Sequence, residues 1–132
     1  MEKNAYTAVK KPGKKKSAEA LARPIAEIWI LPGNPPTVFP PSLPLASNGS
    51  KHPAQVYWQA QDETKKYRIT FPVSPFKKAG PFDTGTDGST AVQKVNASAS
   101  NGSFVYMVTQ IGPPPTPGSF VAPGSGVIIE ES

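Results

Sequence analysis

The sequence predicts an all-β protein, a single antiparallel β-sandwich that follows a basic N-terminal arm. The length of 132 residues suits one domain plus an extension. Seventeen Pro and eleven Gly are too many for a helical protein. Short alternating segments such as residues 66–71 (KYRITF) are separated by turn residues along much of the chain. Each such strand has one apolar face that a second sheet must cover, so we expect two sheets that pack face to face as a sandwich.

The charge divides the chain into an arm, residues 1–23, and a domain, residues 24–132. The arm holds seven basic and two acidic side chains and therefore carries the whole net charge of +5. The domain holds seven of each sign and is formally neutral. Because the arm has little apolar surface to offset the entropy of ordering it, we expect it to be flexible.

The first half of the domain is expected to contain three strands. Residues 25–31 (IAEIWIL) predict the first strand, and residues 32–53 predict a long proline-rich connection in an extended backbone. Four apolar residues are expected to hold this connection to the domain: Val38, Phe39, Leu43 and Leu45. Residues 55–60 and 66–71 follow as the clearest strand pair, joined by a polar turn. In the second of them Tyr67 and Arg68 must point to opposite faces, because side chains alternate along a strand.

The second half alternates loops and strands. Residues 72–88 are expected to form a loop anchored by Phe76 and Phe82, and residues 90–95 a weak strand. A turn at Asn101-Gly102 precedes a strong strand at 104–111, which is dense in β-branched and aromatic residues. A proline turn over 112–118 then leads to the last strand, residues 126–130. The total is six or seven short strands, the number typical of a β-sandwich.

Five segments of the domain carry a resemblance to a known family. They are Trp58, residues 66–71, Ser74-Pro75-Phe76, residues 104–108 (FVYMV) and residues 123–130 (PGSGVIIE). Together they resemble small cupredoxin-like bacterial proteins of unknown function, over roughly residues 54 to 130. The resemblance implies a cupredoxin-like or immunoglobulin-like antiparallel sandwich. Copper-binding cupredoxins use two His, a Cys and usually a Met, whereas this chain has one His and no Cys, so we expect the fold without the metal.

No catalytic or metal constellation is predicted. His52 has no second imidazole or thiolate to complete a zinc or copper site, and it is the only base that a serine triad could use. We interpret it as a solvated loop residue. We therefore expect no cofactor and no bound metal.

One motif resembles an enzyme signature. Residues 82–86 (FDTGT) resemble the active-site turn of aspartic proteases, in which two Asp share a proton. The motif occurs once in the chain, so Asp83 could share a proton only with the Asp83 of a second chain, in a homodimer. We favour a turn in which Asp83 and Asp87 bond nearby amides and Gly85 and Gly88 adopt positive φ. A protease-like activity through Asp83 is kept as a residual alternative to a protein that is not an enzyme.

The most prominent functional feature is a lysine cluster in the arm, which consists of Lys10, Lys11, Lys14, Lys15 and Lys16. Such a cluster attracts polyanions without reading their sequence. The leading hypothesis is a non-enzymatic β-sandwich module that binds a protein partner or assembles with copies of itself. The alternative is an accessory protein that the arm tethers non-specifically to nucleic acid.

The expected location is the cytoplasm. The arm lacks the apolar stretch of a secretory signal, and the longest purely apolar run, residues 28–31, is far too short to span a membrane.

Overall fold

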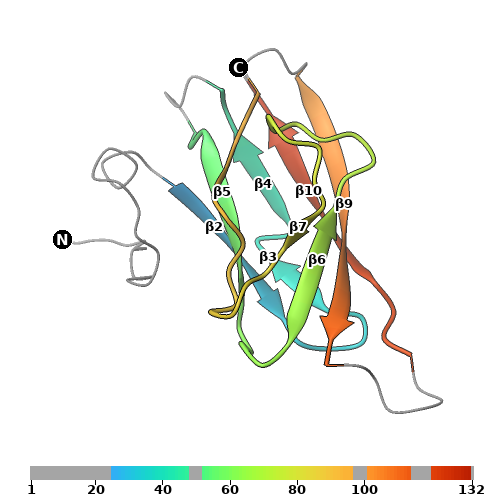
Figure 1. Cartoon of the computed structure of the whole chain (residues 1–132). Helices are drawn as coiled ribbons and strands as arrows, with labels where there is room; N and C mark the ends of the chain where they lie inside the picture. Colours follow the sequence, from blue (N-terminus) through green and yellow to red (C-terminus); the bar gives the residue numbers. More distant parts are fainter. Residues whose placement is uncertain (1–24, 48–51, 97–100, 114–119, 132) are drawn as a thin grey trace.

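The computed structural model describes residues 25–47, 52–96, 101–113 and 120–131, and these residues form nine strands in two sheets. Figure 1 shows the strands running up and down the long axis of the domain. The all-β sandwich is therefore confirmed. The arm, with its five clustered lysines, lies outside the described residues. None of the described residues belongs to a helix that could cross a bilayer.

The larger sheet has five strands in the order β4-β10-β9-β6-β7. Its central strand is β9 (Gly102–Gly112), the longest of the nine, between β10 (Gly124–Glu130) and β6 (Lys66–Thr70). The two edges are β4 (Ser42–Leu45) and β7 (Phe82–Asp83). All pairings are antiparallel except that between β4 and β10.

The smaller sheet has four strands in the order β3-β2-β5-β8. These are β3 (Thr37–Phe39), β2 (Ile25–Leu31), β5 (Gln55–Ala60) and β8 (Gln93–Lys94). The pair β2 and β5 is parallel. The expectation of a purely antiparallel sandwich was therefore wrong, because the long connection between these two strands gives the chain room to return and run in the same direction.

The connection over 32–53 is more ordered than expected. It contains two strands, β3 and β4, which lie in different sheets. Val38 and Leu45 are buried and Leu43 packs against the core, but Phe39 is exposed and anchors nothing. Pro44 lies within β4, where it is tolerated because β4 is an edge strand and needs hydrogen bonds on one side only.

The expected hairpin of residues 55–60 and 66–71 does not form. Strand β5 pairs with β2 and β8, whereas β6 pairs with β9 and β7 in the other sheet. The turn between them therefore crosses from one sheet to the other. A polar turn of this length can span the spacing of about 10 Å between packed sheets, so the sequence of the turn does not distinguish a crossing from a hairpin.

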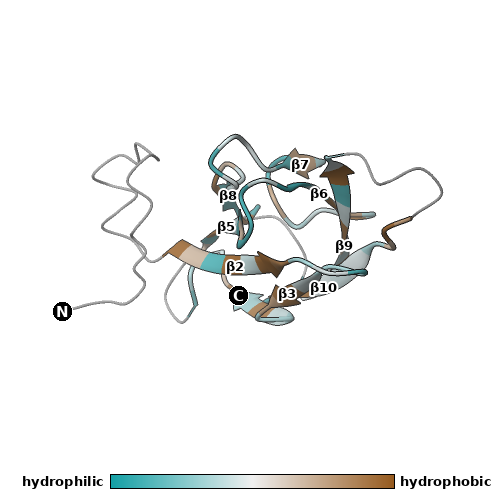
Figure 2. Cartoon of the chain, turned by 90° about the horizontal axis from the view of Figure 1, so that it is seen from below, coloured by the Kyte–Doolittle hydropathy of each residue, from teal (hydrophilic) through white to brown (hydrophobic). Residues whose placement is uncertain are grey.

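An aromatic cluster fills the space between the sheets. Trp58 is fully buried at its centre, and its ring lies 5.4 Å from that of Tyr106 and 6.1 Å from that of Phe76. The expected anchors Phe76 and Phe82 are both buried in this cluster, as is Phe71. Figure 2, the view from below, shows the strands arranged around this common interior. Burial of each such ring contributes roughly 1.5–3 kcal/mol, so the cluster is a large contribution to the stability of a chain without disulfides.

Candidate interaction surface

Asp83 is engaged in an ion pair on the outside of the larger sheet. Its Oδ1 and Oδ2 accept hydrogen bonds from Arg68 Nε and Nη2 at 2.8 and 2.9 Å. The two residues face each other across β6 and β7. The Arg68 guanidinium holds the pKa of the Asp83 carboxyl below its usual value. A carboxylate held in its charged form by an Arg is a poor member of a proton-sharing pair.

The turn after β7 matches its prediction only in part. Asp87 Oδ1 accepts hydrogen bonds from the backbone N–H and the hydroxyl of Ser89, and Gly88 has a φ of +84°, as expected. Asp83, however, lies on a strand and bonds Arg68 rather than an amide, and Gly85 does not adopt positive φ. The sequence analysis expected a loop here and did not predict the short strand β7 or its pairing with β6.

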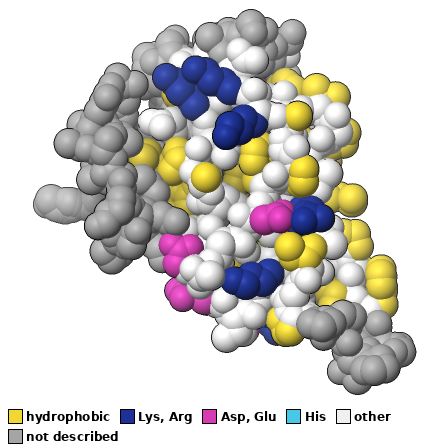
Figure 3. Space-filling model, in the orientation of Figure 1, with side chains coloured by type: hydrophobic (Ala, Val, Ile, Leu, Met, Phe, Trp, Pro, Cys, Tyr) yellow, Lys and Arg dark blue, Asp and Glu magenta, His cyan; other side chains and the backbone are white. Residues whose placement is uncertain are grey.

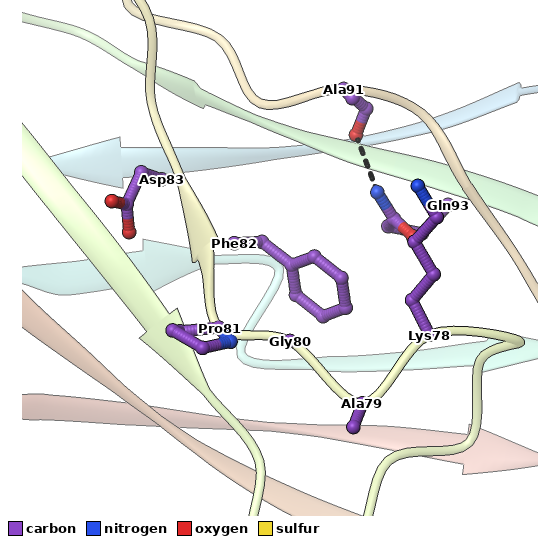
Figure 4. Close-up of a pocket in the computed structure, with 8 residues that line it drawn as sticks. All are labelled: Lys78, Ala79, Gly80, Pro81, Phe82, Asp83, Ala91 and Gln93. Carbon is purple, nitrogen blue, oxygen red and sulfur yellow. Dashed lines mark hydrogen bonds between the residues drawn. The ribbon is translucent and has the colours of Figure 1, made fainter.

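A hollow of about 350 Å³ opens beside β7 and β8. Figure 4 shows the Phe82 ring in the hollow, whereas the Asp83 carboxylate points away from that ring. The remaining polar groups are Lys78 and Gln93, and Gln93 Nε2 donates to the carbonyl of Ala91 at 3.5 Å. The side chains that line the hollow hold no nucleophile paired with a base, so it offers no arrangement for covalent or acid–base catalysis.

His52 lies near the end of β10 and meets one carboxylate. Its Nε2 is 3.0 Å from Glu131 Oε1, and both side chains are partly exposed. Within the described ranges, no three His, Cys, Asp or Glu side chains are grouped so that they could hold a metal ion. A copper site of the cupredoxin kind also needs a thiolate, which this chain cannot supply. The residues present do not fit copper.

Several apolar side chains are exposed on the outer face of the larger sheet. On β9, Tyr106 and Val108 point into the core, and the alternate residues Val105, Met107 and Ile111 point outward. These three side chains are 57%, 46% and 43% exposed, and Val73, just after β6, is 67% exposed. We call these four residues the β9 surface. In Figure 3, hydrophobic side chains gather along the right-hand side of the molecule, where β9 runs in the same view.

A groove of about 370 Å³ opens at one end of the β9 surface. It is lined by Pro72, Val73, Ser103, Phe104 and Val105, so its walls are almost entirely apolar. The strand register places it where β9 begins, because Thr70 at the end of β6 pairs with Met107. The sequence did not reveal this surface, since apolar residues occupy both faces of β9 and leave no period-two signal to tell inside from outside.

The strands at the edges of the two sheets are short or contain proline. Strands β7 and β8 have two residues each and β3 has three, and β4 contains a proline. Short edges and proline disfavour the addition of another strand at these four strands.

Comparisons with known proteins name no family. No protein-family model matches the chain, and the search of curated proteins gives no match. Among solved structures, the fold is similar to that of an oxidized mutant of amicyanin at a TM-score of 0.43 and 13% sequence identity. That match covers 83% of this chain and 92% of the amicyanin chain. The assignment of a two-sheet sandwich rests on the strand pairing described above.

Proposed function

We propose that this chain is a non-enzymatic β-sandwich module that binds a protein partner or assembles with copies of itself through the β9 surface. The observation that carries the proposal is the exposure of Val73, Val105, Met107 and Ile111 together. Singly scattered exposed apolar residues are ordinary, but several apolar side chains gathered along one side of a strand and bordered by polar side chains are typical of an interaction site.

The polar groups beside the β9 surface already have partners within the chain. Arg68 pairs with Asp83, and Lys66 Nζ donates to the carbonyl of Gly85 at 3.1 Å. A partner can therefore cover the β9 surface while the charge of Arg68 stays paired with Asp83 and Lys66 keeps its hydrogen bond, which limits the cost of burying polar groups.

The test uses a double variant, Met107→Lys with Ile111→Lys, in the full chain. Both side chains are partly exposed, so the folded domain accommodates lysine, which circular dichroism verifies. We expect association, measured by sedimentation for the chain alone and by binding assays for any purified partner, to weaken at least tenfold. The matched control is Phe39→Lys, which changes an exposed aromatic residue on the smaller sheet. Association that the double variant leaves unchanged contradicts the proposal.

A second function is favoured by the charge distribution. We propose that the lysine cluster of the arm tethers the chain to nucleic acid, since five of the fourteen basic residues lie within seven positions of an otherwise neutral chain. Replacement of Lys10, Lys11, Lys14, Lys15 and Lys16 by Gln should then abolish binding to random-sequence DNA. If all five contact phosphates, the wild-type chain should show a slope of about −4.5 in log K against log salt. Binding that survives the five substitutions overturns this second proposal.

A further inference from the structure

Two lysines face each other beside the edge strand β8 of the smaller sheet. Phe76 and Val95 form an antiparallel bridge, and the Lys77 N–H donates to the Lys94 carbonyl at 3.2 Å, so Lys77 and Lys94 occupy directly opposite positions. Both side chains are exposed. Opposite residues of an antiparallel pair share one face, and like charges in such a pair repel and destabilise it. An anion that lies between the two ammonium groups relieves this repulsion.

A third lysine lies beside this pair. Lys78 follows Lys77 in the chain and lines the hollow beside β7 and β8 together with Gln93, which precedes Lys94. Figure 4 shows the Lys78 side chain extending alongside Gln93. We call Lys77, Lys78 and Lys94 the lysine edge. Among the described residues, no ion pair joins any of the three to a carboxylate, so their charges are not neutralised by direct contact.

The acidic side chains at the same end of the domain are engaged elsewhere. Glu27, on β2, accepts a hydrogen bond from the Tyr57 hydroxyl at 2.7 Å. Glu131 Oε1 lies 3.0 Å from His52 Nε2, and Glu130 is 1% exposed. In Figure 3, basic side chains gather near the top of the molecule, and the acidic side chains visible in that view lie lower. Because these acids offset part of the distant field, we expect an anion to bind the lysine edge by direct contact.

The lysine edge lies next to the point where the arm joins the domain. In the smaller sheet, Ile25 pairs with Gln55, and Gln55 pairs with Lys94. Neighbouring strands are about 4.8 Å apart, so the backbone of Lys94 is about 10 Å from that of Ile25. The lysine cluster of the arm ends at Lys16, nine residues before Ile25, a stretch that spans at most about 30 Å. One polyanion can therefore contact both groups of lysines.

We propose that the lysine edge binds backbone phosphates of the nucleic acid that the arm tethers. This inference rests on the second proposed function and adds a site on the folded domain to it. Lysine binds phosphate as a point charge, so Lys77 and Lys94 can hold one phosphate between them or two neighbouring ones. The arm keeps the strand within reach, so the second contact forms at the high effective concentration of a linked site. Contacts to phosphates alone carry no base preference.

The test compares two double variants of the full chain in binding to random-sequence duplex DNA. The edge variant is Lys77→Gln with Lys94→Gln. The matched control is Lys65→Gln with Lys66→Gln, which removes the same charge after β5, where both lysines already contact oxygen atoms of the chain. If each edge lysine contacts one phosphate, the wild-type slope of log K against log salt steepens from about −4.5, the value for the arm alone, to about −6.3. The edge variant should return to about −4.5 and bind at least tenfold more weakly at about 50 mM salt. The control should keep the wild-type slope.

The repulsion between the facing lysines gives a second readout that needs no nucleic acid. In low salt and without DNA, the edge variant should unfold at a temperature no lower than the wild-type chain, because two like charges are gone. Added DNA should raise the unfolding temperature of the wild-type chain more than that of the edge variant. An edge variant that unfolds earlier than the wild-type chain would show that the two lysines stabilise the fold, which overturns the argument for an anion site.

The outcomes separate this inference from the function on which it rests. If the edge variant keeps the wild-type slope while substitution of the five arm lysines abolishes binding, the lysine edge is overturned and the tether stands. If binding survives the arm substitutions and is lost in the edge variant, the tether is overturned and the phosphate site on the domain is supported. An equal loss in the edge variant and its control shows a general effect of charge and overturns the inference. An edge variant that weakens binding to anionic lipid vesicles and leaves DNA binding unchanged also overturns it.

Discussion

The side chain of Tyr106 on β9 lies directly over Gly126 on β10. The two residues are paired in register, and a Cβ at position 126 would overlap the Tyr106 hydroxyl oxygen and its ring carbon Cζ. The tyrosine is fully buried against Trp58 and Phe71, so its ring has no free space to move into. Burial also raises the pKa of the Tyr106 phenol to about 12. The absence of a side chain at Gly126 is thus a condition for the packing of the core.

Replacement of Gly126 by Ala should therefore destabilise the domain. Overpacking of a core typically costs about 1–3 kcal/mol in the free energy of unfolding, and the contact with a ring in a closed core places this variant at the upper end. Urea unfolding measures the change. The control is Gly85→Ala, where the new Cβ would meet its nearest atom at 3.6 Å and φ is not positive. Equal stability of the two variants would contradict the packing described here.

Two phenylalanines of very different burial give a second prediction. Phe76 is 3% exposed and packs edge to face on Trp58, whereas Phe120 contributes nothing to the core. Phe76→Ala should lower the free energy of unfolding by about 3–5 kcal/mol, the usual range for a buried aromatic residue. Phe120→Ala should change it by less than about 0.5 kcal/mol. A large loss in the second variant, again measured by urea unfolding, would mean that Phe120 supports the fold.

The ion pair between Arg68 and Asp83 should be visible in a titration. Because the pKa of Asp83 is lowered mainly by its hydrogen bonds to Arg68, Arg68→Gln should raise that pKa toward the ordinary value of about 3.9. Carbon-detected NMR of the Asp83 carboxyl measures it directly. Lys66→Gln is the control, since Lys66 bonds the carbonyl of Gly85 instead. An Asp83 pKa that does not move in Arg68→Gln contradicts the pair.

The same pair sets the sign of a pH effect on stability. A carboxyl whose folded pKa lies below its unfolded value stabilises the folded state above the unfolded pKa, about pH 4. That contribution is lost as the pH falls through the folded pKa. The difference in stability between the wild-type chain and Asp83→Asn should therefore be constant near neutral pH and shrink in acid. If the stability difference between the wild-type chain and Asp83→Asn grows as the pH falls, the pKa of Asp83 is raised by folding and the ion pair described here is contradicted.

Metal binding offers a further check. After incubation with copper or zinc and dialysis, the chain should retain no stoichiometric metal, because His52 has one carboxylate beside it and the chain has no thiolate. Elemental analysis measures the metal content. Retained copper that disappears in His52→Ala would show that His52 is a ligand.

Local sequence was sufficient to predict most strands and much of the core. Residues 25–31 and 55–60 were predicted with the bounds that β2 and β5 have, and Tyr67 and Ile69 are buried while Arg68 is exposed. These features depend on the alternation of side chains within one strand. The aromatic anchors Phe76 and Phe82 were predicted from residue type instead, because large aromatic side chains in a polar loop are often buried, although Phe39 shows that the same reasoning can fail.

The tertiary structure alone decided which strands pair and which apolar residues stay outside. The parallel pairing of β2 with β5 and the crossing turn before β6 depend on contacts between distant segments, about which a short window carries no information. The same holds for Arg68 and Asp83, which meet only because β7 aligns with β6. On β9, Val105 and Met107 have the same apolar character as Tyr106 and Val108, and only the position of the second sheet makes one pair interior and the other an exposed surface. Which face of a strand is buried depends on which element packs against it. When both faces are apolar, as on β9, the residues of the strand do not show which face that is.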